Sequence, residues 1–409
     1  MWGAGDLSIC ILKEYDRILL CRKKERRVSM LLIHISREIL VKAIQHVYKA
    51  VSSNGRGTMI SGIYIFAGSD GVIFSGSGTS LTVQYKVCTS DRKVRILSQG
   101  SIACQANYFY EICRKLMDDI VIIEVTEQRM LYITSGSTQV RLNGMLNIDT
   151  PLLSPKNHQQ TTYHILVPCN LLVSMINQVS GVASMTDAKP IFMGVYLEIQ
   201  GSQLTMIATD GVVRMARCSI PIENDTGWTG ISVIPASSLI DIAKMLTNDG
   251  FTDVAIELNH YEIRFTTPNL LIKSALIEGL YPSTRSLVPR FHVSEVVLNN
   301  KTFRQLLDRV SVLADHHLIT MQISEGKLRL LTNTAEIGDV SDVLDLEEQS
   351  GENFSITING KFLISTLRCI DEDYIRIRFT GSRSPILLLP VREERDWLFL
   401  LTPVMTKSS

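Results

Sequence analysis

Apolar and polar residues follow two different periods along most of this chain. Six segments place apolar residues three and four positions apart, which is the spacing of an amphipathic helix. The fifth segment carries Phe303, Leu306, Leu307 and Val310 on one such stripe. The six predicted helices begin near Ile39, Tyr108, Asn170, Ser238, Thr302 and Lys361.

Between these segments the period changes to two, which is typical of half-buried antiparallel strands. GSQLTMIATDG, from Gly201, and DYIRIRFTG, from Asp373, both alternate in this way. Asn259 and Asn333 stand where tight turns between such strands favour asparagine. We therefore expect each helix to be followed by about three or four strands.

The helical segments recur roughly every 60 to 70 residues, which indicates an internal repeat. The first, third and fifth helical segments are each followed by a pair of predicted strands marked by glycines. The larger repeating unit therefore contains two helices, and the chain contains three such units. Proline and polar residues in 147–162 and 276–293 mark the breaks. We predict an α+β protein of three similar domains, each with two helices on antiparallel sheets: 30–154, 155–288 and 289–409.

Residues 1–29 are expected to form a mobile extension ahead of the first domain. Glu14 and Asp16 interrupt their apolar part, and the basic run RKKERR follows that part instead of preceding it, unlike a secretory signal. A basic arm that touches nucleic acid is the alternative interpretation. Met1 and Met30 both remain possible start sites.

The composition is that of a soluble globular protein, with 45% apolar and 20% charged residues. No apolar run approaches the roughly 18 residues of a membrane-spanning helix. None of the eight cysteines shows the two-residue gap of a zinc or redox motif, so we predict a reduced, cytoplasmic protein. Because the net charge is zero, a polyanionic partner would have to meet a local basic patch.

Such patches are predicted on the outward faces of the helices. Helical spacing puts Lys361, Ser365 and Arg368 together on the sixth segment. On the fifth, Arg304 shares a face with Asp308 and Ser311, with Arg309 beside them. The outer face of the first is predicted to hold Lys42, Gln45, His46 and Lys49. These faces would neutralise phosphates without reading bases, although ordinary solvated helices also carry lysine and arginine.

Motifs for catalysis or cofactor binding are not supported. GSDGVIFSGSG, from Gly68, lacks the lysine of a phosphate-binding loop. His316 and His317 are adjacent and cannot share a helical face as metal ligands. Asp210, in IATDGVVRMA, fits a catalytic acid, a phosphate loop or a plain hairpin turn. We predict no metal, no cofactor and no enzymatic activity.

Several segments, taken in order, resemble the beta subunit of bacterial DNA polymerase III, the sliding-clamp family. They are KAVSSN, LNGM, PIFMGVYLEI, IATDGVVRMA, IPASSLIDIAKML, LIEGLYPSTRSLVP, FRQLLDRVSVLA and GKFLISTLRCID. The resemblance extends from about Met30 to Met405. It implies the DNA clamp fold, with each chain forming half of a six-domain ring.

The resemblance implies a head-to-tail homodimer that encircles duplex DNA without sequence preference and confers processivity at replication forks. Its implied partners are the polymerase III alpha subunit, the clamp loader, whose ATPase opens the ring, and other proteins with short clamp-binding peptides. Helices would line the hole and sheets would form the wall. The implied DNA-facing residues are Lys42, Lys49, Arg56, Arg114, Lys115, Lys189, Lys244, Arg304, Arg309, Lys361 and Arg368.

The resemblance also implies a peptide pocket between the second and third domains, in which Asp210 is a turn residue. The residues at the pocket positions are Phe192, Thr209, Gly211, Arg214, Met215, Pro282, Leu287, Pro385, Leu400, Thr402, Pro403 and Val404. The dimer contact would join an edge of the first domain to an edge of the third. It would involve Val140, Arg141, Leu142, Val312, Leu313, Glu336 and Asp339.

Two departures from the family pattern leave a second function open. Val212 and Val213 stand where a histidine usually precedes the pocket arginine, and Ser286 replaces a common arginine. A diverged clamp paralogue, acting as a regulatory or scaffolding protein with altered partner binding, is therefore the alternative prediction.

Overall fold

The computed structural model describes residues 29–52, 62–91, 93–145, 164–186, 188–224, 227–247, 250–334 and 337–404. Residues 1–28 of the predicted extension, Arg56 and Glu336 lie outside these ranges. The chain divides into two compact units. The first contains residues 1–79 and 83–153, and the second contains 80–82 and 154–409.

The first unit has two helices and two groups of antiparallel strands. One sheet has the order β5 (Val94–Ser98), β1 (Ser29–Ser36), β7 (Ile120–Thr126), β8 (Met130–Ser135) and β9 (Thr138–Asn143). The other group has the order β4 (Leu81–Cys88), β3 (Gly71–Ser77), β2 (Gly62–Ala67) and β6 (Gly100–Gln105). Helices α2 (Arg37–Ser52) and α3 (Ala106–Lys115) contact each other and these strands.

The second unit repeats this arrangement twice. Its first module orders β14 (Gly230–Pro235), β11 (Gly194–Gln200), β12 (Gln203–Thr209) and β13 (Arg214–Pro221). A second group orders β10 (His164–Pro168), β15 (Asp253–Leu258), β16 (Glu262–Thr266) and β17 (Leu270–Ala275). The helices of this module are α4 (Cys169–Ser180) and α5 (Ala236–Thr247).

The last module follows the same plan. One group orders β26 (Asp396–Leu401), β25 (Ile386–Pro390), β24 (Tyr374–Phe379), β18 (Ser294–Asn299) and β22 (Glu348–Gly351). The other sheet orders β21 (Gly338–Asp345), β20 (Lys327–Thr334), β19 (Leu318–Ser324) and β23 (Phe354–Asn359). Its helices are α6 (Asn300–Val310) and α7 (Gly360–Arg368).

Backbone pairing between β13 and β26 joins the two modules of the second unit into one sheet. Six positions pair in antiparallel register, from Arg214 with Leu401 to Ser219 with Asp396. Met215 lies opposite Leu400 in this register. The ladder therefore fixes residues that are far apart in the sequence next to one another.

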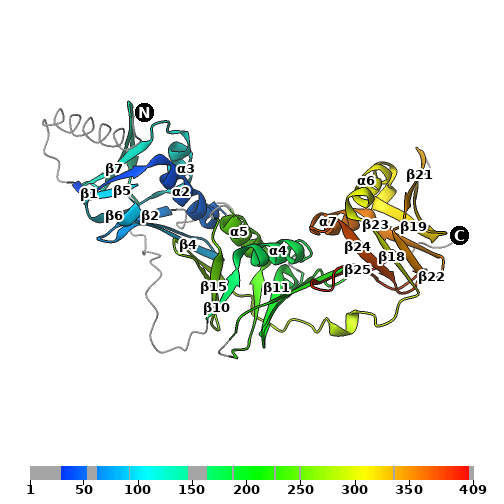
Figure 1. Cartoon of the computed structure of the whole chain (residues 1–409). Coiled ribbons are helices and arrows are strands. Elements are labelled where there is room, and N and C mark those ends of the chain that lie inside the picture. Colours follow the sequence, from blue (N-terminus) through cyan, green and yellow to red (C-terminus); the bar gives the residue numbers. More distant parts are fainter. Residues whose placement is uncertain are drawn as a thin grey trace, which may run out of the picture. The chain divides into compact units, whose positions relative to one another are not determined.

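The predicted helical stripes are confirmed. Phe303, Leu306, Leu307 and Val310 are all buried, and the helices of each module lie side by side (Figure 1). Asparagines at 299 and 359 begin α6 and α7, where each side chain accepts a hydrogen bond from the backbone amide three residues on. The strand number differs from the prediction, because α2 and α6 are each followed by five strands in the described part of the chain.

The prediction that His46 lies on the outer face of α2 is wrong. His46 is buried, and its ring stacks on Tyr85 of β4 with the two ring centroids 5.3 Å apart. Spacing along α2 alone could not show that a neighbouring strand covers this part of the helix. Lys42 and Lys49, on the same predicted face, are half-buried.

The described cysteines carry free thiols: Cys88, Cys104, Cys113, Cys169, Cys218 and Cys369. Burial raises the pKa of the Cys218 thiol to about 12, and it also raises the pKa of Cys104 and Cys113. These thiols therefore stay protonated and behave as small apolar side chains. In the described ranges, no helix is both long and apolar enough to cross a membrane.

Candidate functional site

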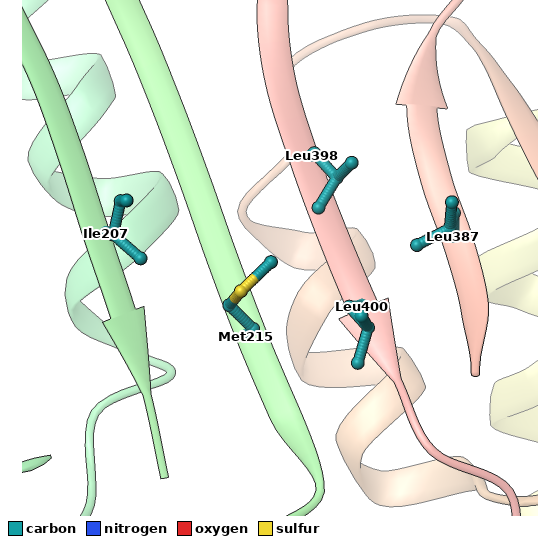
Figure 2. Close-up of a cluster of buried hydrophobic side chains, with 5 residues drawn as sticks. All are labelled: Ile207, Met215, Leu387, Leu398 and Leu400. Carbon is teal, nitrogen blue, oxygen red and sulfur yellow. The ribbon is translucent and has the colours of Figure 1, made fainter. Parts of the chain in front are cut away.

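An apolar cluster lies across the joined sheet where the second and third modules meet. It is made by Ile207 of β12, Met215 of β13, Leu398 and Leu400 of β26 and Leu387 of β25 (Figure 2). Their side chains share one face because residues two apart on a strand, and residues paired across strands, point the same way. The partly buried residues Tyr196, Tyr281, Val288 and Leu389 pack against this cluster.

Asp210 closes the turn between β12 and β13. Its Oδ1 accepts hydrogen bonds from the backbone amides of Val212, Val213 and Arg214 at 2.8–3.1 Å. Its Oδ2 accepts a further bond from Arg214 Nε at 2.9 Å. This is the geometry of a structural turn.

The same contacts fix the charge of Asp210. Partial burial acts to raise its pKa, but the hydrogen bonds from Arg214, Val213 and Val212 together outweigh burial, so the pKa lies below its ordinary value. Asp210 is therefore ionised at neutral pH and already fully engaged. A general acid would need the opposite, a proton held near neutrality.

Arg214 does not point into the apolar cluster. It is adjacent to Met215 on β13, and successive side chains on a strand point to opposite faces. Its guanidinium lies over the ring of Phe362 of α7, with Cζ 4.4 Å from the ring centroid. Its Nη1 also lies 3.5 Å from the carbonyl oxygen of Gly181, at the end of α4. Arg214 therefore connects the two modules on the helix side of the sheet.

The predicted pocket residues thus fall into two groups on opposite faces. Met215 and Leu400 belong to the apolar cluster, whereas Arg214 lies with Phe362. Sequence reasoning missed Phe362, and the available signal was an aromatic residue in the first turn of α7, outside the apolar stripe of Leu363 and Leu367. It also missed Ile207 of β12, and it missed Leu387 and Leu398, where apolar side chains recur at every second position on β25 and β26.

The backbone around the turn is tied to both modules. Thr209 N donates to the hydroxyl of Tyr281 at 3.1 Å, which anchors the connector between the modules. The Tyr281 pKa is raised by burial. Thr402 N donates to the carbonyl of Val213 at 2.9 Å. Val404 N donates to the carbonyl of Thr357 at 2.9 Å.

The remaining pocket positions are more exposed. Pro282 is exposed and Leu287 is half-exposed on the connector, and neither belongs to the apolar cluster. Pro385 and Pro403 are half-buried at the ends of β25 and β26. Phe192 meets Tyr281 edge-on, with the ring centroids 6.2 Å apart.

Gly211 gives a direct test of how tightly this turn is built. Its φ is +80°, and an added Cβ would lie 2.5 Å from the Phe192 ring. We expect Gly211→Ala to lower the free energy of unfolding by about 1–3 kcal/mol, because it combines backbone strain with a clash. Gly201→Ala is the matched control, since Gly201 also has a positive φ, +57°, but nothing lies within 4 Å of its added Cβ. Denaturant titrations measure both losses in the free energy of unfolding. Equal losses for the two variants would contradict the expected clash between the added Cβ at position 211 and the Phe192 ring.

The predicted DNA-facing cations occupy several different surroundings. Arg114, Lys115, Lys244, Lys361 and Arg368 are exposed, and Arg304 is half-buried. Lys189 is exposed but lies outside the helices, with its Nζ 5.7 Å from the Phe192 ring centroid. It therefore lies beside the turn and not on a helix face.

Arg309 forms an ion pair within its own module. Its Nε and Nη2 contact Asp342 of β21 at 2.7 and 2.6 Å. Five residues along a helix correspond to a rotation of roughly 140° beyond a full turn, so Arg309 and Arg304 lie on different faces of α6. The pair with Asp342 holds Arg309 toward the sheet.

Acidic neighbours offset much of the remaining helix charge. Arg114 and Lys115 both contact Glu111, and Lys244 contacts Asp241. Arg368 Nη2 lies 3.6 Å from Asp308. By contrast, Arg304 and Lys361 form no ion pair with any residue that the structure describes. Helix α4 contains no charged residue, and α5 contains one aspartate and one lysine. The basic character is therefore concentrated in α2, α6 and α7.

The predicted dimer residues lie on two sheet edges. Strand β9 is an edge of the first sheet, with half-buried Val140 and Leu142 alternating with exposed Arg141. Strand β21 is an edge of the last sheet and carries exposed Asp339. Val312 is 80% exposed and Leu313 half-buried in the short helical turn Ser311–Leu313, next to β20 and β21.

Two cavities lie away from these predicted pocket residues. One, of about 820 Å³, lies between the start of α6, the segment 370–374 and the β25–β26 turn. The other, of about 730 Å³, lies between α4 and the helices of the third module. Neither contains any of the twelve predicted pocket residues. Within the described ranges, no three His, Cys, Asp or Glu side chains form a group that could hold a metal ion.

Three repeats of two helices on antiparallel sheets, with sheets that join across a module boundary, define the clamp fold. The three family models that describe the DNA polymerase III beta subunit match this chain in order. The N-terminal domain model matches 31–154, the central domain model 166–283 and the C-terminal domain model 285–398. The chain therefore belongs to the DNA polymerase III beta-subunit family.

Comparison with individual relatives supports the same family assignment. The beta sliding clamp of Bacillus subtilis is 32% identical over 91% of this chain and 99% of its own length. That of Halalkalibacterium halodurans is 31% identical over 91% and 99%. The crystal structure of the Bacillus subtilis DNA polymerase sliding clamp has a TM-score of 0.85 at 31% identity, covering 92% of this chain and all of its own. The function of the chain is accordingly that of a DNA sliding clamp, a processivity factor and not an enzyme.

Proposed function

We propose that two copies of this chain join head to tail into a ring of six modules that encloses duplex DNA. The observation that carries the proposal is the ordered match of all three family models along one chain. Our assignment of the modules to 30–154, 155–288 and 289–409 is part of this proposal. The ring would act in the cytoplasm, at replication forks.

The proposed contact between copies pairs the edge strand β9 of one chain with β21 of the other. An edge strand offers unpaired backbone groups, and pairing across a subunit boundary satisfies them. The half-buried Val140 and Leu142 would then meet apolar side chains such as Val312. The charges also complement one another, because β9 carries Arg141 and β21 carries Asp339 and Asp345.

The helices would face the DNA and hold it through many weak phosphate contacts. Exposed cations on α6 and α7, such as Lys361, supply charge without base readout. Because much of the helix charge is already offset by neighbouring acids, the grip would be loose enough to permit sliding.

Partner proteins would dock short peptides against the joined sheet. A leucine or phenylalanine of the peptide can extend the apolar cluster at Met215 and Leu400, where burial of one apolar anchor contributes strongly to affinity. The proposed partners are the polymerase III alpha subunit, the clamp loader and other proteins that carry such peptides.

Retention on circular DNA tests the proposal. The protein is loaded onto nicked circles by its loader, and the circles are then linearised. Retention on circles and loss from linear DNA are expected for a ring that encloses the duplex. A protein that binds partner peptides but is never retained on circles would instead fit the regulatory or scaffolding alternative.

The dimer contact gives a second expected result. Val312→Asp should raise the dimer dissociation constant by about 100-fold or more, because the contact would bury an unpaired carboxylate. Sedimentation at micromolar concentration measures this shift. Ile231→Asp, at a 63% exposed position on β14, is the control and should remain a dimer. A dimeric Val312→Asp protein would contradict the assigned edge.

A further inference from the structure

Two arginines of β24 border the apolar cluster on the sheet face where that cluster lies. Arg378 is paired with Leu387, the member of the cluster on β25 (Figure 2). Arg376 is paired with Leu389, which packs against the cluster. Residues paired across neighbouring strands point to the same face of a sheet, so both arginines lie beside the cluster. We call Arg376 and Arg378 the β24 arginine pair.

The β24 arginine pair shares one carboxylate. Glu295 of β18 is paired with Arg378 in the strand register, and its Oε2 accepts a hydrogen bond from Arg378 Nε. Its Oε1 lies 3.6 Å from Arg376 Nη1. The ring of His292 also faces this carboxylate, with Nε2 3.8 Å from Glu295 Oε2. Two guanidinium groups against one carboxylate leave a net positive charge at this border of the cluster.

The β13 border of the cluster has a different charge balance. Arg217 is paired with Leu398 of β26 and therefore lies on the same sheet face. Its Nη2 lies 2.7 Å from Asp396 Oδ1, so one arginine meets one carboxylate there. An acidic ligand is therefore favoured at the β24 arginine pair more than at Arg217.

The β24 arginine pair is partly shielded but still reachable from solvent. The side chains of Arg376 and Arg378 are 29% and 35% exposed, and that of Glu295 is 18% exposed. Each arginine therefore keeps part of its surface open to a ligand. Partial burial lowers the local dielectric constant, so an ion pair formed here is screened less than one on the open surface. Arginine also presents the planar fork that binds a carboxylate with two hydrogen bonds.

The spacing of the strands fixes how far a ligand on the cluster would be from these arginines. Leu389 is one strand away from Arg376, a spacing of about 4.8 Å. Glu348 of β22 lies on the same face, but Val297 of β18 separates it from Arg376 in the register. Glu348 is therefore about two spacings away. An acidic side chain next to an apolar group on the cluster would be closer to the arginine pair than Glu348 is.

We propose that the β24 arginine pair binds an acidic side chain next to the apolar anchor of a docked peptide, and so selects acidic peptides among possible partners. This inference rests on the proposed docking of peptides on the joined sheet. It adds a charge-specific contact, because the pocket positions implied by family resemblance include neither Arg376 nor Arg378. Two guanidinium groups also suit phosphate, but the adjacent apolar cluster favours a ligand that has an apolar side chain beside its anion.

The test compares two short labelled peptides on the full chain by fluorescence anisotropy. Both carry a leucine–phenylalanine anchor, and the residues on either side of it are aspartates in one peptide and asparagines in the other. The unaltered protein should bind the aspartate peptide about threefold to tenfold more tightly at low salt, and this preference should shrink as salt screens the charges. Equal affinities at low salt would overturn the proposal.

Two substitutions locate the preference within the cluster border. Arg378→Gln should bring the two affinities within about twofold of each other, because Glu295 then offsets the remaining guanidinium of Arg376. Glu295→Gln should increase the preference for the aspartate peptide, because it leaves both guanidinium groups without their shared carboxylate. A preference that Glu295→Gln lowers, or that Arg378→Gln leaves unchanged, would overturn the proposal.

Arg329→Gln is the matched control. Arg329 is an exposed arginine of β20, in the sheet that does not contain the cluster, and its replacement changes the net charge by the same amount. The preference for the aspartate peptide should be unaltered in this variant. If Arg329→Gln lowers the preference as much as Arg378→Gln does, the effect is one of general charge and the arginine pair has no specific role.

Failure of this inference can be told apart from failure of the proposed docking. If both peptides bind equally and Leu400→Ala weakens both, docking on the cluster stands and the arginine pair does not select acidic peptides. If neither peptide binds the unaltered protein, the docking proposal fails and this inference fails with it. If Arg378→Gln weakens binding of duplex DNA and leaves the peptide preference unchanged, the pair contacts phosphate and the peptide contact is overturned.

Discussion

Asp210→Ala is expected to lower the free energy of unfolding by about 2–4 kcal/mol. The substitution removes one carboxylate that accepts three backbone amide hydrogen bonds and one from the Arg214 side chain. It leaves Arg214, whose side chain is 13% exposed, without its charged partner. Hydrogen bonds to charged groups contribute more than neutral ones, and unsatisfied buried donors are costly. Chemical denaturation with the full chain measures the loss.

Two controls separate this effect from loss of an ordinary surface charge. Asp241→Ala breaks the exposed pair with Lys244, where the lysine side chain is 60% exposed, and should cost at most about 1 kcal/mol. Asp210→Asn keeps an acceptor oxygen but loses the charge. Its loss in the free energy of unfolding should therefore lie between those of Asp210→Ala and Asp241→Ala. A loss for Asp210→Ala no larger than that for Asp241→Ala would show that the turn is held mainly by other contacts.

The Asp210 effect should also depend on pH. The pKa of Asp210 is lowered in the folded chain. Its contribution to stability is therefore complete when the pH is above the pKa of about 4 that an aspartate has in the unfolded chain. The contribution is lost as the pH falls through the lower, folded pKa. The stability difference between the unaltered protein and Asp210→Asn should therefore be constant near neutral pH and shrink in acid. A difference that grew below about pH 4 would contradict the assigned direction.

Leu400→Ala is expected to affect both stability and partner binding. Leu400 is 5% exposed in the apolar cluster, and truncating a buried leucine costs about 2–5 kcal/mol. If the cluster also receives a partner's apolar anchor, the affinity for a short polymerase peptide should fall about tenfold or more. Fluorescence anisotropy with a labelled peptide measures this loss.

Leu330→Ala provides the matched control for that experiment. Leu330 is fully buried on β20, in the sheet that does not contain the cluster. Its truncation should destabilise the protein similarly and leave peptide affinity unchanged. If both variants lose peptide binding equally, the loss reflects general destabilisation, and the cluster is not the docking surface.

The repeat and the helices could be predicted because their signals are local. An apolar stripe such as that of Phe303 and Leu307 depends on spacing within one segment, and a helix that buries one face must show it. The sheet order could not be predicted in the same way. The pairing of Met215 with Leu400 joins positions far apart in sequence, and no local pattern fixes that register.

The site was predicted less completely for a related reason. Family resemblance named Arg214 and Met215 together, but strand alternation sends them to opposite faces. That signal was present in the sequence once β13 was recognised as a strand. The stacking of Arg214 on Phe362 and the burial of His46 against Tyr85 both require knowing which elements are neighbours. Such contacts become visible only after the chain is folded.

The ladder between β13 and β26 has a mechanical consequence. Bending the second unit at its module boundary would break backbone hydrogen bonds along six paired positions and pull Arg214 away from Phe362. That boundary is therefore unsuited to act as a hinge. A ring of such chains must therefore open at another boundary, and we expect the two modules of the second unit to move as one rigid body.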